Sequence, residues 1–334
     1  MPLKPHFRTS SSRKRGSDSR FRGNDTEVVK PALRHLLTVR DLTAAQIDDL
    51  FRKAAQMKKS RSHPRPLSGK ILGLLFQKPS VRTRVSFEVG MAQLGGQSIY
   101  IGPVELQEGK REGVKDLARV LSRYLDGIVA RTFSHSDVEG LAQWATVPVI
   151  NGLSDFSHPC QALGDLFTIR ERFGRLKGIR VGYVGDGNNV CHSLISGCAL
   201  MGVHFTVATP PRYRPDPRHL KWALGQASRS GAKISVTGNP KEAVRGAQVV
   251  YTDVWTSMGQ ESQRAKRRAD FRGFQVNEPL LKLADRRGVF MHCLPAHRGE
   301  EVTNEVMDSK RSIVYDQAEN RLHLQKAILL SLLK

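Results

Sequence analysis

The sequence has few cysteines and no long apolar run, and each absence excludes a class of protein. It contains four cysteines and no CxxC pair, at Cys160, Cys191, Cys198 and Cys293. Cysteines spread in this way are typical of a reducing compartment, and they argue against a disulfide framework and a structural zinc site. No segment approaches the roughly 20 consecutive apolar residues that a membrane-spanning helix needs. We therefore expect a soluble, globular, cytoplasmic protein.

Acidic residues are also scarce relative to basic ones. The 31 Asp and Glu residues stand against 53 Lys and Arg residues, which gives a formal net charge of +22. Such an excess raises the hypothesis of a nucleic-acid-binding protein. The cations are spread along the chain, however, with clusters at 212–221 and 264–272, and no RNA- or DNA-binding motif accompanies them. We favour a basic surface around an enzyme that binds anions, with nucleic acid as the weaker alternative.

The first 32 residues lack apolar periodicity and are rich in Ser, Arg and Gly. This composition predicts a disordered basic tail over residues 1–32. The tail has no apolar core of the kind found in secretory signals. Its acidic residues, Asp18, Asp25 and Glu27, argue against a mitochondrial presequence.

From Leu33 onward, short apolar runs alternate with helical stretches. We expect strands at residues 71–76, 98–102, 126–130 and 147–152, and then at 178–185, 204–209, 233–238, 247–253 and 288–294. Helices are expected at 81–95, 113–125, 136–145, 160–174 and 319–334. Buried strands that alternate with helices predict parallel sheets covered on both faces. The fold class is therefore α/β, with two doubly wound domains at 33–172 and 173–318, joined by the helix at 160–174, and a C-terminal helix at 319–334.

The stretch FQKPSVRTR, residues 76–84, leads from a strand into a helix whose first turn carries Ser80, Arg82 and Thr83. A helix N-terminus has free backbone N–H groups and partial positive charge, so it binds anions. Arginines and hydroxyls added to it can make a phosphate cradle. The plain alternative is a capped helix start with solvated arginines.

The stretch SHPCQALGD, residues 157–165, follows a strand and places His158 and Gln161 at the start of the expected connecting helix. Pro159 fits the first turn of that helix. A neutral imidazole and an amide can donate hydrogen bonds to a carbonyl oxygen. A lone histidine is more often structural, so the functional interpretation depends on the nearby phosphate cradle.

Two stretches of the second block also follow strands. GDGNNVCHS, residues 185–193, lacks the G-x-G-x-x-G pattern of dinucleotide-binding folds, and its asparagines suit the carboxylate or amine of an amino acid. DVWTSMGQE, residues 253–261, offers Asp253 for a substrate ammonium, although a surface turn is the plain interpretation. MHCLPAHRGEEV, residues 291–302, leaves three possibilities: metal ligands, a nucleophile with its base, or the wall of a polar pocket.

These motifs, in this order on two α/β blocks, resemble the aspartate/ornithine carbamoyltransferase family. SxRTR and HPxQxLxD are typical of the whole family, whereas DVWxSMGxE and HCLPAHRGEEV resemble its ornithine-using members. The similarity runs from Leu33 to Lys334 and includes DLARVLSRYLDGIVAR, residues 116–131. It implies transfer of the carbamoyl group of carbamoyl phosphate to the δ-amine of L-ornithine, which gives L-citrulline and phosphate in arginine biosynthesis. It implies no cofactor and no metal, and it leaves the direction in the cell open.

The resemblance also implies the site residues. Carbamoyl phosphate would be bound by Ser80, Val81, Arg82, Thr83, Gln107, Arg131, His158, Gln161, Cys293, Leu294 and Arg321. Ornithine would be bound by Asn189, Asp253, Ser257 and Met258. The catalytic residues would be Arg131, His158, Cys293 and Thr83. Gln107 would reach the site of a neighbouring subunit, which implies a homotrimer or a multiple of one, and the C-terminal helix would cross back to the first domain.

In this interpretation the Cys293 thiol orients the amine beside Asp253 and is not an attacking nucleophile. The metal interpretation of the last motif is disfavoured, because alternation along a strand would send His292 and Cys293 to opposite faces. Position 81 is valine where the family commonly has threonine, which predicts activity with weaker phosphate binding. The nearest rival is a relative that uses putrescine or an acylated ornithine as acceptor.

Overall fold

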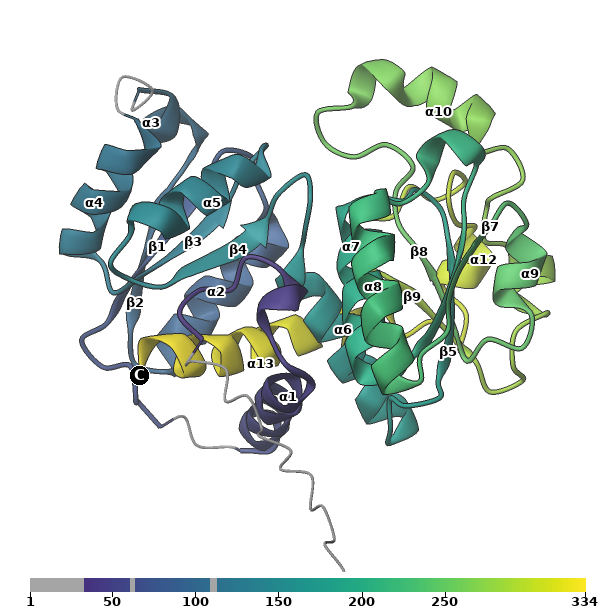
Figure 1. Cartoon of the computed structure of the whole chain (residues 1–334), viewed down its shortest axis with the longest axis horizontal. Coiled ribbons are helices and arrows are strands. Elements are labelled where there is room, and N and C mark those ends of the chain that lie inside the picture. Colours follow the sequence, from purple (N-terminus) through teal and green to yellow (C-terminus); the bar gives the residue numbers. More distant parts are fainter. Residues whose placement is uncertain (1–32, 61–63, 109–112) are drawn as a thin grey trace, which may run out of the picture. The chain divides into compact units, whose positions relative to one another are not determined.

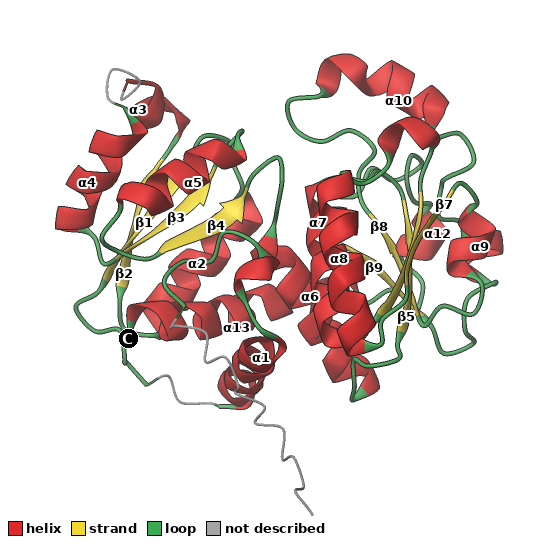
Figure 2. Ribbon diagram, in the orientation of Figure 1, coloured by secondary structure: helices red, strands yellow, loops and turns green. Residues whose placement is uncertain are grey.

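The computed structural model describes residues 33–60, 64–108 and 113–334, with the side chains of residues 107 and 108 excepted (Figure 1). The tail predicted at 1–32 lies outside the described residues. In both α/β halves helices cover both faces of a parallel sheet (Figure 2), as the alternation of strands and helices predicts. In this part of the chain no helix combines the length and the apolarity that crossing a membrane requires.

The first sheet has four parallel strands in the order β2-β1-β3-β4. Their bounds are β1 Ile71–Phe76, β2 Gln97–Ile101, β3 Gly127–Arg131 and β4 Val149–Leu153. The accompanying helices are α1 Ala44–Lys59, α2 Val81–Gln93, α3 Pro103–Glu108, α4 Val114–Tyr124, α5 His135–Trp144 and α6 Pro159–Phe173, preceded by the 3-10 turn η1 Val39–Asp41. All four strands are confirmed within two residues of the predicted bounds.

The second sheet has five parallel strands in the order β7-β6-β5-β8-β9. They are β5 Arg180–Val184, β6 His204–Ala208, β7 Ile234–Thr237, β8 Val249–Thr252 and β9 Val289–His292. The helices are α7 Asn189–Met201, α8 Pro217–Ser230, α9 Pro240–Val244, α10 Arg264–Asp270, α11 Glu278–Leu281 and α12 Asn304–Met307, with short 3-10 turns at Pro211–Tyr213 and Glu261–Gln263. These strands are also confirmed within two residues, while the exact domain boundaries stay a prediction.

The connecting helix α6 is buried along its first eleven residues, from Pro159 to Ile169, and it ends at Gly174 in a left-handed conformation. The C-terminal helix α13, Val314–Leu333, packs against α1, α2 and α6, so the expected return to the first domain is confirmed (Figure 1). Helix α13 begins five residues before the predicted start. Its early buried positions include Gln317 and Asn320, whose polarity hides the helical pattern.

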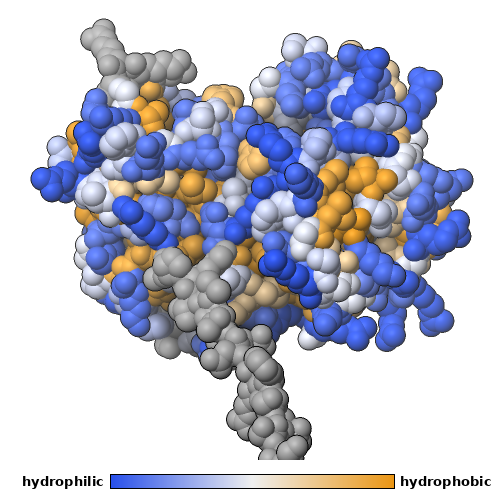
Figure 3. Space-filling model, viewed as in Figure 1, coloured by the Kyte–Doolittle hydropathy of each residue, from blue (hydrophilic) through white to orange (hydrophobic). Residues whose placement is uncertain are grey.

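The basic residues lie mainly on the surface, and the face drawn in Figure 3 is largely hydrophilic. Within the described ranges, the buried lysines and arginines are Lys78, Arg131, Arg267, Arg321 and Lys326. Lysine and arginine are almost never fully buried without a partner. Each of these buried cations therefore needs either a partner within the protein or a bound anion.

Candidate active site

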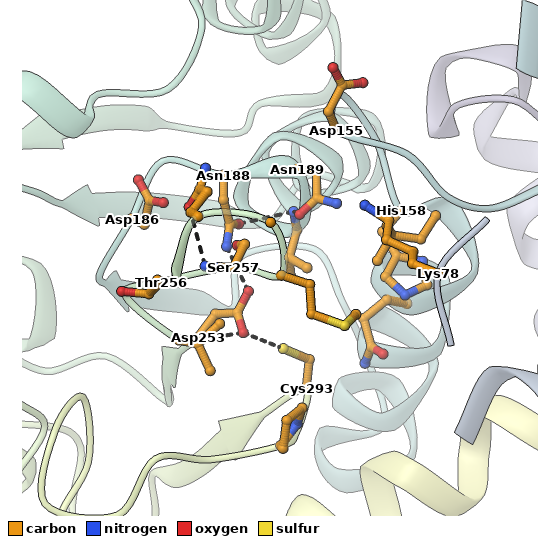
Figure 4. A pocket seen from close by; sticks show the side chains of 18 of the residues that line it. Lys78, Asp155, His158, Asp186, Asn188, Asn189, Asp253, Thr256, Ser257 and Cys293 are labelled. Carbon is orange, nitrogen blue, oxygen red and sulfur yellow. Dashed lines mark hydrogen bonds between the residues drawn. The ribbon is translucent and has the colours of Figure 1, made fainter. Parts of the chain in front are cut away.

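A cavity of about 860 Å³ lies at the carboxyl ends of strands from both sheets (Figure 4). This is where parallel α/β sheets place their ligands. Every predicted site residue whose side chain is described lines it: Ser80, Val81, Arg82, Thr83, Arg131, His158, Gln161, Asn189, Asp253, Ser257, Met258, Cys293, Leu294 and Arg321. Gln107 lies in α3, and its side chain is outside the described part of the chain. The motifs of both halves thus contribute to one cavity.

The first turn of α2 forms one wall of this cavity. Ser80 is the N-cap, and its hydroxyl accepts a hydrogen bond from the backbone N–H of Thr83 at 3.3 Å. The plain interpretation of a capped helix start is therefore correct, and it is compatible with anion binding, because the other N–H groups of the first turn stay available. Val81 is 78% exposed at this point.

Changing Val81 to Thr tests the departure at this position. The added hydroxyl can donate a hydrogen bond to a phosphate oxygen, a contact of about 1 kcal/mol. We expect the KM for carbamoyl phosphate to fall about fivefold, with kcat and the KM for ornithine unchanged, in steady-state kinetics. Val120→Thr, which changes an exposed valine of α4, is the matched control. An unchanged KM for carbamoyl phosphate would contradict the interpretation.

Four of the five buried cations line the cavity: Lys78, Arg131, Arg267 and Arg321. The Nε atoms of Arg131 and Arg321 are buried and have no hydrogen-bond partner among the residues described. Burial, together with the charges of Arg321 and Arg82, lowers the pKa of Arg131 to about 10. Like charges gathered away from water are unfavourable unless an anion joins them. Arg267 is neutralised by Asp186, whereas Arg131 and Arg321, with the nearby charge of Arg82, have the electrostatics of a phosphate site.

Arg321 reaches this cluster from α13. Its Nη2 donates to the Thr83 hydroxyl at 2.9 Å, and its Nη1 donates to the side-chain oxygen Oε1 of Gln161 at 3.0 Å. The Gln161 amide in turn donates to Asp165 at 2.8 Å. These bonds fix the orientation of Gln161 and Thr83 before any ligand enters.

His158 is held in a neutral state. Burial lowers the pKa of its imidazole well below the usual value, and the charges of Arg321 and Arg131 lower it further. Its backbone N–H donates to the Ser193 hydroxyl at 2.8 Å, and its Nδ1 is buried with no partner in the described ranges. A neutral imidazole with a free nitrogen can donate a hydrogen bond to a carbonyl oxygen. It is poorly suited to act as a proton-accepting base in such surroundings.

The opposite part of the cavity is acidic. The Cys293 thiol donates to Asp253 Oδ1 at 2.8 Å, and the Asn188 side chain donates to Asp253 Oδ2 at 2.7 Å (Figure 4). Burial and the neighbouring carboxylate raise the pKa of Cys293 well above its usual value. Because the thiolate is the nucleophilic form, a thiol kept protonated is a hydrogen-bonding wall. The expected contact of Cys293 with Asp253 is confirmed.

The expectation that His292 and Cys293 point away from each other is wrong. Ligand atoms of Asp253, His292 and Cys293 all lie within 4.8 Å of one another. Strand β9 ends at His292, so the alternation of side chains no longer applies at Cys293. Both nitrogens of His292 are already engaged: Nδ1 accepts from the Leu294 N–H at 2.8 Å, and Nε2 faces Glu301 at 3.2 Å. A site without metal stays our prediction.

The remaining predicted residues border the same space. Asn189 donates to the Ser154 carbonyl at 2.6 Å, which directs its side chain toward the loop before His158. Leu294 has a positive φ of 59°, an uncommon conformation for leucine. Met258 is 48% exposed on the segment after β8.

The sequence interpretation missed several lining residues. Lys78 lies inside FQKPSVRTR, and Asn188 lies beside the predicted Asn189, so their motifs already marked them. Arg267 was assigned to a basic surface cluster, which is wrong for this residue. Its guanidinium is buried and donates to Asp186 at 2.8 Å and to the Trp255 carbonyl at 2.8 Å. No local signal distinguishes it from the neighbouring exposed arginines.

A stack of aromatic rings supports the loop that carries His158. The rings of His192 and His219 are parallel at 4.2 Å, and Phe156 lies 4.1 Å from His219. His192 Nε2 accepts from the Asp216 N–H at 2.9 Å, so the ring is held neutral. His219 is 1% exposed, and neither ring nitrogen has a partner among the described atoms.

This stack predicts acid sensitivity that His219→Phe reduces. Burial lowers the pKa of His219 to about 2 from an ordinary 6.5, so unfolding takes up a proton at lower pH. The contribution to stability is complete above pH 6.5 and is lost as the pH falls toward the folded pKa. Thermal unfolding across pH 4–7 measures the effect. In the variant, the slope of the unfolding free energy against pH should be smaller by up to about 1.4 kcal/mol per pH unit, the value for one proton. An unchanged pH profile would contradict this account.

Comparisons with known proteins agree with this arrangement. Residues 34–171 match the carbamoyl-P binding domain of aspartate/ornithine carbamoyltransferase, and residues 177–332 match its Asp/Orn binding domain. An ornithine carbamoyltransferase of Thermococcus kodakarensis is 53% identical over 305 residues, which cover 90% of this chain and 97% of the relative. An anabolic ornithine carbamoyltransferase of Pyrococcus furiosus is 54% identical, with the same coverage. The solved structure of ornithine carbamoyltransferase from Pyrococcus furiosus has a TM-score of 0.88 at 54% identity, covering 92% of this chain and 99% of that one. The chain belongs to the aspartate/ornithine carbamoyltransferase family.

Proposed function

We propose that this protein is an ornithine carbamoyltransferase, which transfers the carbamoyl group of carbamoyl phosphate to the δ-amine of L-ornithine and forms L-citrulline and phosphate. The observation that carries the proposal is a single cavity with the buried Arg131 and Arg321 on one side and the Asp253 carboxylate on the other. This polarity suits a dianionic donor and a cationic amino acid. The anabolic relative supports a place in arginine biosynthesis.

The first half of the cavity binds carbamoyl phosphate. The α2 N-terminus, Ser80 and Arg82 hold the phosphate, and Arg321 adds charge beside Thr83. Arg131 and His158 donate to the carbamoyl oxygen, where negative charge develops as the amine attacks. Fixed donors aimed at that oxygen stabilise the transition state without reorganisation.

The second half binds ornithine. Asp253, already held by Asn188 and Cys293, faces the α-ammonium of ornithine. Asn189, Ser257 and Met258 line the space for the rest of the amino acid. The δ-amine of ornithine has an ordinary pKa of about 10.4 and is protonated in water. The cations in the other half of the cavity favour its neutral form.

The reaction then needs little chemistry from the protein. The neutral δ-amine attacks the carbamoyl carbon, the bond to the phosphate oxygen breaks, and the departing phosphate accepts the amine proton. Holding two reactants in contact is a large source of rate enhancement. Cys293 and Leu294 orient the amine at the point of attack.

A colorimetric citrulline assay with the purified chain tests the proposal. We expect citrulline from ornithine and none from putrescine or N-acetylornithine, and loss of activity in Arg82→Ala. Preference for another acceptor would identify the rival relative. Salt-sensitive nucleic-acid binding without citrulline formation would favour the basic binding protein and overturn the proposal.

The assembly is proposed as a homotrimer or a multiple of one, with Gln107 completing a neighbouring site. Helix α2 exposes Val81, Val85 and Val89 by 78%, 48% and 37%, and their spacing places them on one helix face. Ile99 and Val104 are also exposed, by 48% and 67%. Apolar residues gathered in this way favour contact with another subunit.

Native mass spectrometry distinguishes a monomer from a trimer and larger forms. The cytoplasmic location stays a prediction.

A further inference from the structure

Lys78 is a buried lysine that the reaction described above does not use. It follows β1 by two residues, lines the cavity, and is 8% exposed. Its ammonium lies 4.8 Å from the centre of the Phe133 ring. Over the described ranges, no hydrogen bond or ion pair joins it to another side chain, although buried lysines are nearly always paired. An unpaired amine therefore faces the substrate cavity.

The surroundings of Lys78 favour its neutral form. Burial and the nearby Arg131 lower the pKa of Lys78 to about 8, and Asp155 opposes them only in part. A desolvated lysine beside another cation is an arrangement that makes amines nucleophilic. At mildly alkaline pH much of this side chain carries a free electron pair.

The amine lies in the half of the cavity assigned to carbamoyl phosphate. The charge of Lys78 is among those that lower the pKa of His158. Figure 4 draws both residues on the same side of the cavity, away from Asp253 and Cys293. Since His158 is the proposed donor to the carbamoyl oxygen, a donor bound there would occupy the part of the cavity that Lys78 lines.

We propose that Lys78 is a second carbamoyl acceptor, modified by bound carbamoyl phosphate when ornithine is absent. The inference rests on the proposed function, because it needs a bound donor. The neutral Nζ forms a bond to the carbamoyl carbon, the bond from that carbon to the phosphate oxygen breaks, and the departing phosphate takes the amine proton. The product is a lysine that carries a urea group. It has lost its charge and blocks the donor site.

In this proposal ornithine protects the protein, because it consumes the bound carbamoyl phosphate before Lys78 can react. With ornithine present, the δ-amine beside Cys293 takes the carbamoyl group and the donor leaves as phosphate. Without it, the donor stays in place and the slower acceptor reacts. Activity should therefore decline with time in carbamoyl phosphate alone, in step with the fraction of Lys78 that is modified.

The experiment follows intact mass and peptide maps of the full chain incubated with carbamoyl phosphate at about pH 8. Free cyanate, a breakdown product of carbamoyl phosphate, modifies any accessible lysine without binding at the donor site. It is used in parallel as the reagent that needs no binding site. Arg82→Ala, which weakens donor binding and keeps Lys78, is the matched variant, and Lys78→Arg removes the acceptor. Citrulline formation is measured on each preparation before incubation.

We expect modification of Lys78 at a rate that saturates with carbamoyl phosphate and slows about tenfold or more in Arg82→Ala. Cyanate should modify Lys78 equally in both proteins and without saturation. Lys78→Arg should keep its initial activity, whatever its level, through the incubation. Absence of the urea group on Lys78, or modification that only follows the cyanate concentration, overturns the inference. If citrulline still forms in that case, the proposed function stands, whereas absence of citrulline contradicts the function itself.

Discussion

Arg131→Met lowers kcat for citrulline formation by roughly 10²–10³-fold, the effect of removing one fixed donor to a developing oxyanion. The same change leaves the unliganded protein as stable as the parent or more stable. Arg131 is 5% exposed, and its charge lies near those of Arg321 and Arg82. Replacing an uncompensated buried charge with an apolar side chain of similar length is neutral or stabilising.

The measurement combines steady-state kinetics with thermal unfolding in the absence of ligands. Arg268→Met, which removes an exposed arginine from α10, is the matched control and should change neither property. Loss of activity together with a large drop in unfolding temperature would mean that Arg131 supports the fold, and its assignment to the carbamoyl oxygen would fail.

Asp253→Asn lowers kcat/KM for ornithine by about 10²-fold or more, in keeping with the 2–5 kcal/mol lost when one member of a buried charge pair is removed. The carboxylate accepts from both Cys293 and Asn188, on different oxygens. An asparagine keeps one acceptor oxygen and carries no charge, so it can neither satisfy both donors nor pair with the ornithine ammonium.

The affinity for carbamoyl phosphate should change by less than about twofold in this variant, because its proposed contacts lie in the other half of the cavity. Thermal shift with carbamoyl phosphate alone measures this affinity. Asp308→Asn, which breaks the exposed ion pair with Arg298, is the control. Equal losses for the two substrates would contradict the division of the cavity into two halves.

The strands were predictable because parallel strands buried on both faces appear as short apolar runs. Val149 and Ile150 in β4, or Val249 and Val250 in β8, have no polar alternation to confuse with a surface strand. The start of α13 was not predictable from the sequence. Gln317 and Arg321 are buried there at helical spacing, in place of the apolar residues that mark a buried helix face.

The site was predictable where polar residues cluster at the end of a strand. Ser80, Arg82 and Thr83 follow β1, and His158 follows β4. Single buried charges such as Arg267 were not predictable. Their burial depends on a partner far along the chain, here Asp186, and the local sequence around Arg267 consists of arginines and lysines that are exposed.

Helix α13 brings one of the cavity's residues to the first domain from a distant part of the chain. Arg321 lies on it, and its apolar residues, among them Leu324 and Ile328, cover the first domain. A variant truncated before Val314 would lack Arg321, which lines the cavity, and would expose the apolar surface that α13 covers. The cavity therefore depends on both α/β halves and on α13 together, and neither half can be expected to work as a separately expressed fragment.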